Sequence, residues 1–244
     1  MTASEPNGDW LTARPIAHRG LHDRSRGIIE NTPGAITAAV AGGYGIEVDV
    51  QLSADGEAMV HHDEALGRLT EGDAPLATLG AAALKQVPFR ETADRMITLG
   101  ELCDLVAGRA TLVVEIKSLW DGDERLARRT ATVLSGYRGP VAAMSFDPRL
   151  VAAVRRHAPG LRRGLVAERG VEDRPGSALR YLQNLLAAGP QFLAYSVQDL
   201  GDAVTFTTRR LLRRPVLTWT VRTPEDRLRA GRLADQMIFE GFIP

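Results

Sequence analysis

The feature that most constrains the fold is a repeated alternation of short β-branched runs with helical segments along most of the chain. Runs rich in Val, Ile and Thr and bounded by Gly or Pro predict strands. About eight such runs occur, at residues 15–18, 45–52, 111–117, 141–146, 161–167, 192–197, 216–221 and 236–239. Between them lie helical segments, in which Pro33 opens one helix and Asp147 caps another before Pro148. This pattern predicts an α/β fold, a single (β/α)₈ TIM barrel.

The alternative architecture is an open, doubly wound parallel sheet. That fold normally carries a glycine-rich phosphate loop after its first strand, where this chain has HRGLHD. The barrel is therefore favoured, as one domain over residues 1–244. The long interval at residues 53–108, between the second and third expected strands, is expected to be an insertion at the barrel mouth with its own helical runs.

Charge and cysteine content exclude several classes of function. Basic and acidic residues number 30 each, so no net positive field would attract nucleic acid. The single Cys103, in an apolar helical run, argues against a disulfide framework and against a cysteine-based zinc site. No stretch has a signal-peptide pattern or approaches the ~20 apolar residues of a membrane span. We therefore expect a cytoplasmic protein without stable membrane association, and homo-oligomerisation stays open.

Carboxylates occupy alternate positions in two of the expected strands. Glu47 and Asp49 are separated by Val48, so on an extended chain they share one face. Glu115 and Lys117 repeat this spacing in the next strand. Burying like charges is costly unless a cation or hydrogen-bond donors offset it. Because hard oxygen ligands suit Mg²⁺ or Ca²⁺, the pattern predicts a site for a divalent cation, with Lys117 free to hold an anionic substrate.

Histidines stand beside these acids in the predicted arrangement. His18 ends the first expected strand, and its ordinary pKa near neutrality suits a general acid or base. Arg19 follows it and can make bidentate contacts to phosphate. His61 and His62 cannot both point toward the acids from an extended chain, and spacing alone does not choose between them.

A polar pair precedes the first expected helix. Asn31 or Thr32 fits a helix N-cap, and capping explains Asn31 without a functional role. Glu30 follows Ile28 and Ile29, and capping explains it less well. We expect Glu30 to lie close enough to His18 to reach the metal or the substrate.

Six stretches, in order along nearly the whole chain, together resemble the glycerophosphodiester phosphodiesterase family. They are AHRG at 17–20, ENTPGAI at 30–36, GIEVDVQLSADGEAMVHHD at 45–63, VEIK at 114–117, SFDP at 145–148 and LTWTV at 217–221. The resemblance implies a (β/α)₈ barrel that hydrolyses glycerophosphodiesters to sn-glycerol 3-phosphate and an alcohol, with one divalent cation as cofactor.

The resemblance also implies roles for individual residues. The implied metal ligands are Glu47, Asp49 and Glu115. The implied acid/base pair is His18 and His62, because the family's second histidine directly precedes an aspartate. Arg19 and Lys117 are the implied phosphate contacts. Glu30 is an implied supporting acid, and Trp219 is implied to form a wall of the glycerol pocket.

The chain departs from the family pattern at two positions. Glu240 stands where an aspartate is usual, and His61 stands where an apolar aromatic residue is usual. Two other functions remain to be distinguished from hydrolysis of small diesters. One is lysophospholipase D-type action on lipid phosphodiesters, which would need an apolar groove. The other is a catalytically silent phosphodiester-binding barrel, which the presence of every acid and both histidines disfavours.

Overall fold

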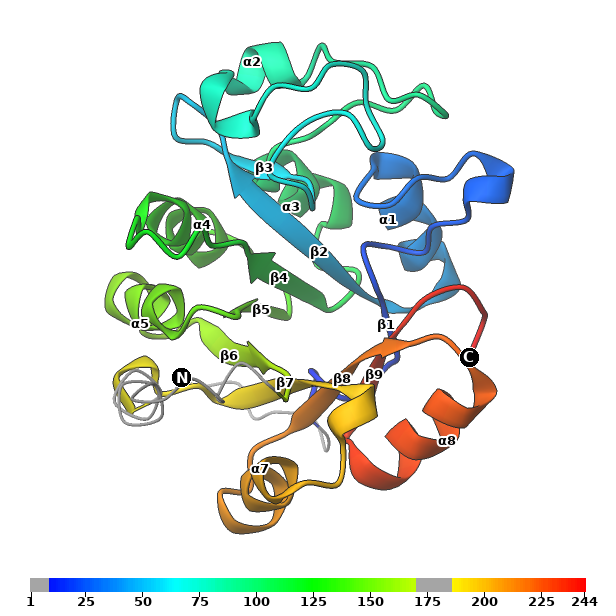
Figure 1. The fold of residues 1–244 in the computed structure, drawn as a ribbon, viewed down its shortest axis with the longest axis vertical. Helices are drawn as coiled ribbons and strands as arrows, with labels where there is room; N and C mark the ends of the chain where they lie inside the picture. Colours follow the sequence, from blue (N-terminus) through cyan, green and yellow to red (C-terminus); the bar gives the residue numbers. More distant parts are fainter. Residues whose placement is uncertain (1–8, 170–185) are drawn as a thin grey trace.

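The computed structural model describes residues 9–169 and 186–244, which form a closed barrel of parallel strands (Figure 1). In these residues the barrel strands are β1 (Ile16–Ala17), β2 (Gly45–Leu52), β4 (Leu112–Ile116), β5 (Val141–Ser145), β6 (Arg162–Ala167), β7 (Phe192–Ser196), β8 (Val216–Val221) and β9 (Gln236–Phe239). The barrel closes because β1 pairs in parallel with both β2 and β9. The predicted (β/α)₈ fold is confirmed, and each strand lies within its expected range.

Helices surround the barrel on its outside (Figure 1). They are α1 (Pro33–Gly42), α3 (Leu99–Val106), α4 (Arg125–Ser135), α5 (Pro148–His157), α7 (Ala203–Phe206), its π-helical continuation η4 (Thr207–Leu211), and α8 (Pro224–Leu233). Pro33 and Pro148 occupy first turns, as predicted, and the Asp147 side chain accepts a hydrogen bond from the Arg149 backbone N–H. Within the described residues, every helix is too short or too polar to span a membrane.

The expected insertion, residues 53–108, contains two different parts. Its last helix, α3, packs between α1 and α4 in the outer ring. The part before it holds β3 (Ala58–Val60), which pairs antiparallel with β2, together with η2 (Leu76–Thr78) and α2 (Ala81–Leu84). This part covers one side of the barrel over a small core of its own. The core residues are Ile29, Met59, Leu66, Leu76, Leu84, Phe89 and Met96.

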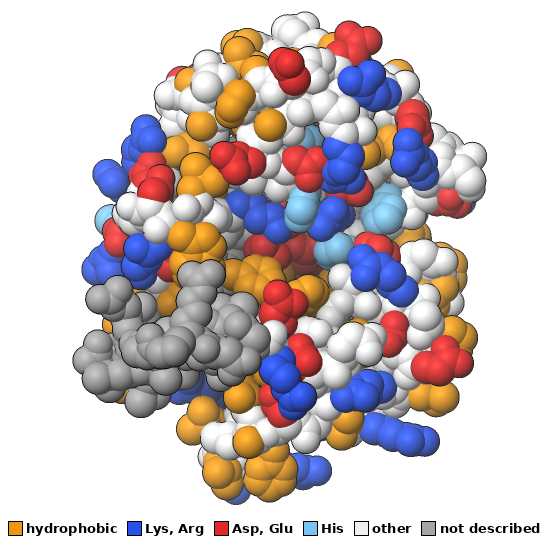
Figure 2. Space-filling model, in the orientation of Figure 1, with side chains coloured by type: hydrophobic (Ala, Val, Ile, Leu, Met, Phe, Trp, Pro, Cys, Tyr) orange, Lys and Arg blue, Asp and Glu red, His pale blue; other side chains and the backbone are white. Residues whose placement is uncertain are grey.

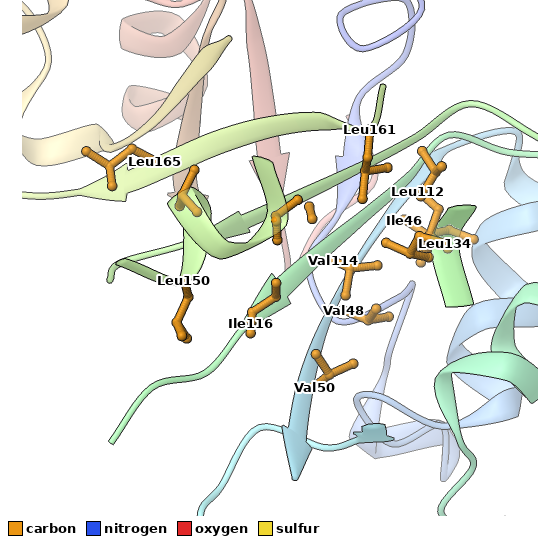
Figure 3. Packing of buried hydrophobic residues seen from close by; sticks show 14 of the residues in the cluster. Ile46, Val48, Val50, Leu112, Val114, Ile116, Leu134, Leu150, Leu161 and Leu165 are labelled. Carbon is orange, nitrogen blue, oxygen red and sulfur yellow. The ribbon is translucent and has the colours of Figure 1, made fainter. Parts of the chain in front are cut away.

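Strand alternation separates the core into an outer and an inner layer. Val48, Val50 and Val114 point outward and pack among helix residues such as Leu134 (Figure 3). The alternate positions face the barrel interior, where a second cluster includes Phe192. A Cβ at Gly164 would lie 2.2 Å from the Phe192 ring, so glycine makes room for it.

Strand register then places the acids. Because Val48 and Val50 face the helices, Glu47 and Asp49 face the interior. The parallel register of β2 and β4 sets Asp49 beside Glu115. The fold therefore directs carboxylates from neighbouring strands into one space, near the end of the barrel where chemistry collects in this fold.

Candidate active site

Three buried carboxylates meet inside the barrel. Glu47, Asp49 and Glu115 are 1%, 1% and 8% exposed. Each offers a carboxylate oxygen, and these oxygens all lie within 4.8 Å of one another. The structure thus brings together the acids that the strand spacing singled out.

The charge of this acidic cluster is incompletely balanced. Burial and the neighbouring carboxylates raise the pKa of Glu47 well above its ordinary value, and burial with Asp49 raises the pKa of Glu115. Burial alone would also raise the pKa of Asp49, but the charges of Lys117 and Arg19 hold it well below its usual range. A further cation would relieve the repulsion that remains.

The donor set fits a hard divalent cation. Glu47 Oε1 is buried and, within residues 9–169 and 186–244, has no hydrogen-bond partner. Oxygen ligands from carboxylates are those that Mg²⁺ and Ca²⁺ prefer. Glu47, Asp49 and Glu115 could therefore hold such an ion.

Both predicted phosphate contacts border the acids. Lys117 Nζ lies 2.7 Å from Asp49 Oδ1 and 2.6 Å from Glu115 Oε1. Arg19 Nε lies 3.2 Å from Asp49 Oδ2, and its Nη1 donates to Glu30 Oε1 at 2.6 Å. Two cations are thus fixed beside the carboxylates.

The turn after β1 holds Arg19 in a special backbone conformation. Arg19 has φ 55° and Gly20 has φ 79°, both in the left-handed region. A Cβ at Gly20 would lie 2.8 Å from the Ala35 carbonyl carbon, so glycine permits close approach of α1. This turn aims the Arg19 backbone N–H at Glu47 Oε2, 3.0 Å away.

Asn31 has a role that differs from the expected helix cap. The N-cap of α1 is Thr32, whose side chain makes no capping bond. Asn31 Nδ2 donates to Asp49 Oδ2 at 2.9 Å, and Asn31 Oδ1 accepts from the Asp49 backbone N–H at 3.3 Å. Of the two residues expected as caps, Thr32 therefore occupies the N-cap position. Capping is the wrong interpretation for Asn31, because its amide holds the central acid of the cluster.

His18 is held from behind by Glu240. Its Nδ1 forms a short contact with Glu240 Oε2, and Arg222 Nε donates to the other oxygen, Oε1, at 2.6 Å. His18 Nε2 is then directed at the acids, 3.9 Å from Glu47 Oε2. Burial lowers the pKa of His18. Burial alone would raise the pKa of Glu240, but the hydrogen bonds and charges of His18, His22 and Arg222 together outweigh it, and the pKa of Glu240 is depressed.

The structure separates His61 from His62. His62 lines the same cavity as His18, and its Nδ1 lies 2.8 Å from Asp63 Oδ1. His61 is 1% exposed and its ring packs near Phe89, with ring centroids 6.4 Å apart. Of the two, His62 is therefore the one at the site.

One cavity of about 580 Å³ is lined by both histidines of the site, both cations and two of the three acids: His18, His62, Arg19, Lys117, Glu47 and Glu115. Figure 2 shows histidine and charged side chains gathered around a hollow in the middle of this face, with hydrophobic side chains along one part of it. Trp219 belongs to the apolar part, where its ring meets Phe146 edge to face at a centroid distance of 5.4 Å. The indole Nε1 is buried and has no hydrogen-bond partner in the described part of the chain.

Sequence reasoning overlooked two arginines near the site. Arg222, the residue directly after β8, supports Glu240, and Arg68 contacts both Glu30 and Asp63. Arg222 could have been found from its place at the end of an expected barrel strand, where chemistry collects in this fold. Arg68 lies between β3 and η2, and the sequence offers no local signal that would distinguish it from a surface arginine.

Comparison with known sequences points to one family. Residues 18–243 match the Glycerophosphoryl diester phosphodiesterase family. A glycerophosphodiester phosphodiesterase of Caldanaerobacter subterraneus subsp. tengcongensis is 34% identical over 177 residues, which are 68% of this chain and 71% of that protein.

Solved structures of phosphodiesterases have the same fold as this chain. A glycerophosphodiester phosphodiesterase of Thermotoga maritima matches with a TM-score of 0.71 and 27% identity, covering 92% of both chains. An Oleispira antarctica phosphodiesterase, in complex with the product sn-glycerol-3-phosphate, matches with a TM-score of 0.78 and 23% identity, covering 94% of both chains. At that identity, the second likeness bears on the fold alone.

Proposed function

Because the chain belongs to the glycerophosphoryl diester phosphodiesterase family and is thereby a phosphoric diester hydrolase, we propose that it releases sn-glycerol 3-phosphate from small glycerophosphodiesters in a reaction that needs a divalent cation. The observation that carries the proposal is one cavity lined by Glu47 and Glu115 of the acidic cluster, by His18 and His62, and by two fixed cations.

The bound phosphodiester would be held by positive charge. Arg19 and Lys117 both line the cavity, and their side chains are only 18% and 19% exposed. In a partly buried site, such cations stabilise phosphoryl oxygens more strongly than they would in water. Negative charge grows on these oxygens in the transition state, so Arg19 and Lys117 would lower the barrier as well as bind substrate.

The two histidines would handle the protons. Each has Nδ1 beside a carboxylate, Glu240 for His18 and Asp63 for His62, which leaves Nε2 for the substrate. Because burial lowers the pKa of His18, its neutral form predominates at pH 7 and can accept a proton from the attacking hydroxyl. His62 would then donate a proton to the leaving alcohol.

Glu47, Asp49 and Glu115 would hold the divalent cation. When bound, a Mg²⁺ or Ca²⁺ ion supplies Lewis-acid neutralisation of the phosphoryl charge. Asn31 would keep Asp49 oriented through its hydrogen bonds to the side chain and the backbone. Glu30 would support Arg19 through its 2.6 Å ion pair.

The apolar part of the cavity suits the carbon skeleton of the substrate. Trp219, Phe146 and Met144 line it opposite the charged groups. Trp219 would form one wall of the glycerol pocket, with its indole N–H available to a hydroxyl group.

The test is release of sn-glycerol 3-phosphate from glycerophosphocholine by the purified protein, with Mg²⁺, with Ca²⁺ and with chelator. We expect release with a cation and none with chelator. A folded protein that releases no sn-glycerol 3-phosphate with either ion would overturn the proposal.

Two variants test the assignment of residues. His18→Ala should abolish turnover while calorimetry still detects cation binding. Glu47→Gln should abolish both, because it removes a ligand charge. Near wild-type rates in both variants with added cation would show that this cavity is not the site.

A further inference from the structure

Arg68 joins two acids that support different parts of the proposed site. Its Nε donates to Asp63 Oδ2 at 2.6 Å, and its Nη2 donates to Asp63 Oδ1 at 3.2 Å. The same guanidinium reaches Glu30, with Nη2 donating to Oε1 at 2.7 Å and Nη1 to Oε2 at 3.1 Å. One side chain thus makes bidentate contacts with two carboxylates.

Each of these carboxylates has a second partner at the site. Glu30 Oε1 also accepts from Arg19 Nη1 at 2.6 Å. Asp63 Oδ1 also contacts His62 Nδ1 at 2.8 Å. The order of contacts is therefore Arg19, Glu30, Arg68, Asp63, His62, a continuous chain from a phosphate-binding group to an acid/base group.

This arrangement differs from an ordinary surface ion pair. The Arg68 side chain is 46% exposed, so its contacts contribute little to overall stability. The Glu30 and Asp63 side chains are only 14% and 24% exposed, and both turn toward the cavity through their second partners. The contacts of Arg68 therefore act mainly on the orientation of these two acids.

We propose that Arg68 is a positioning residue, which fixes Arg19 and His62 relative to each other through Glu30 and Asp63. The inference rests on the proposed function, since it assigns a support to the groups that bind phosphate and transfer protons. Arg68 lies between β3 and η2, outside the barrel strands. This segment thus takes part in catalysis by holding the site from outside.

The chemistry of the contacts requires arginine. A guanidinium is planar and presents five donors, which allows two carboxylates to be bound side by side. A lysine ammonium keeps the charge but cannot make two bidentate contacts. Arg68→Lys should therefore behave more like Arg68→Ala than like the wild type.

The first experiment compares steady-state kinetics of the wild type, Arg68→Ala and Arg68→Lys. Arg95→Ala is the matched control, because Arg95 lies in the same insertion, residues 53–108, and in the part of the chain that the structure describes it donates only to the backbone carbonyls of Ala93 and Asp94. We expect both Arg68 variants to lose about 10- to 100-fold in kcat through His62 and to show a raised KM through Arg19. The control should match the wild type, and all four proteins should unfold at similar temperatures.

Two further readouts separate positioning from a merely structural role. Guanidinium ion at a low, non-denaturing concentration should partly restore Arg68→Ala, whereas sodium chloride at equal ionic strength should not. In a Glu30→Gln background, Arg68→Ala should raise KM less than it does in the wild type, because its route to Arg19 is already cut.

The outcomes distinguish this inference from the proposed function. An active wild type with Arg68→Ala unchanged in kcat and KM would overturn the inference and leave the function standing. A kinetic loss with a lowered unfolding temperature, no guanidinium rescue and full additivity with Glu30→Gln would also overturn it. An inactive wild type would overturn both.

Discussion

The buried His61 should make the protein measurably less stable in mild acid. Its side chain is 1% exposed, and burial lowers its pKa from 6.5 to about 4. Between these two pH values, His61 is therefore protonated in the unfolded chain but stays neutral in the folded protein. The stability contributed by neutral His61 is present above the unfolded pKa and is lost as pH falls toward the folded one. At 1.36 kcal/mol per pKa unit, the free energy of unfolding falls by about 2.4 kcal/mol between pH 7 and pH 4.5.

The variant that tests this is His61→Leu, which is apolar and of similar size. Urea unfolding at pH 7 and at pH 4.5, both in the presence of chelator, measures how far the free energy of unfolding of each protein falls between the two pH values. The raised pKa values of Glu47 and Glu115 act with the opposite sign, but they are common to both proteins and cancel in the comparison. His157→Gln, which replaces an exposed histidine, is the control, and its free energy of unfolding should fall by as much as that of the wild type. If His61→Leu loses as much stability as the wild type, burial of neutral His61 is not the cause.

Two further substitutions test the site and the core. Glu240→Gln should lower kcat by about 100-fold with little change in KM, because the neutral amide no longer fixes the His18 ring in its productive orientation. Stopped or continuous product assays would reveal this, and an unchanged kcat would remove Glu240 from the site. Gly164→Ala should destabilise the fold by about 1–3 kcal/mol in urea unfolding, since its Cβ would overlap the Phe192 ring. Gly160→Ala, which meets nothing within 4 Å, is the control, and equal stability of the two variants would contradict the packing argument.

The positions fixed by strand geometry were predictable from sequence. Alternation of Val48 and Val50 with Glu47 and Asp49 determines which side chains face inward, whatever the neighbouring loops do. Parallel register then brings Glu115 beside Asp49. The helices α1 and α5 were predictable for a similar reason, because proline and aspartate act on the backbone within their own first turn.

Side chains on connecting segments were predictable only in part. Asn31 stands next to a helix start, where capping is the usual role of asparagine. Its backbone, at φ 57°, instead turns the amide toward Asp49. Asp49 is distant in the sequence, so no local pattern predicts this contact. Glu240 was noticed as a departure from a family pattern, but its pairing with His18 depends on the closure of the barrel by β1 and β9.

The difference between these groups follows from how far a side chain is from the backbone that positions it. The acids of β2 and β4 are short side chains on a fixed lattice of strands, so their meeting follows from register. Arg68 reaches its partners through a long side chain from a segment with little regular structure, and it selects them because two carboxylates already face the site. The position of such a side chain depends on the carboxylates that it binds, and these are placed by the rest of the fold. Its role can therefore be inferred only once the positions of those carboxylates are known.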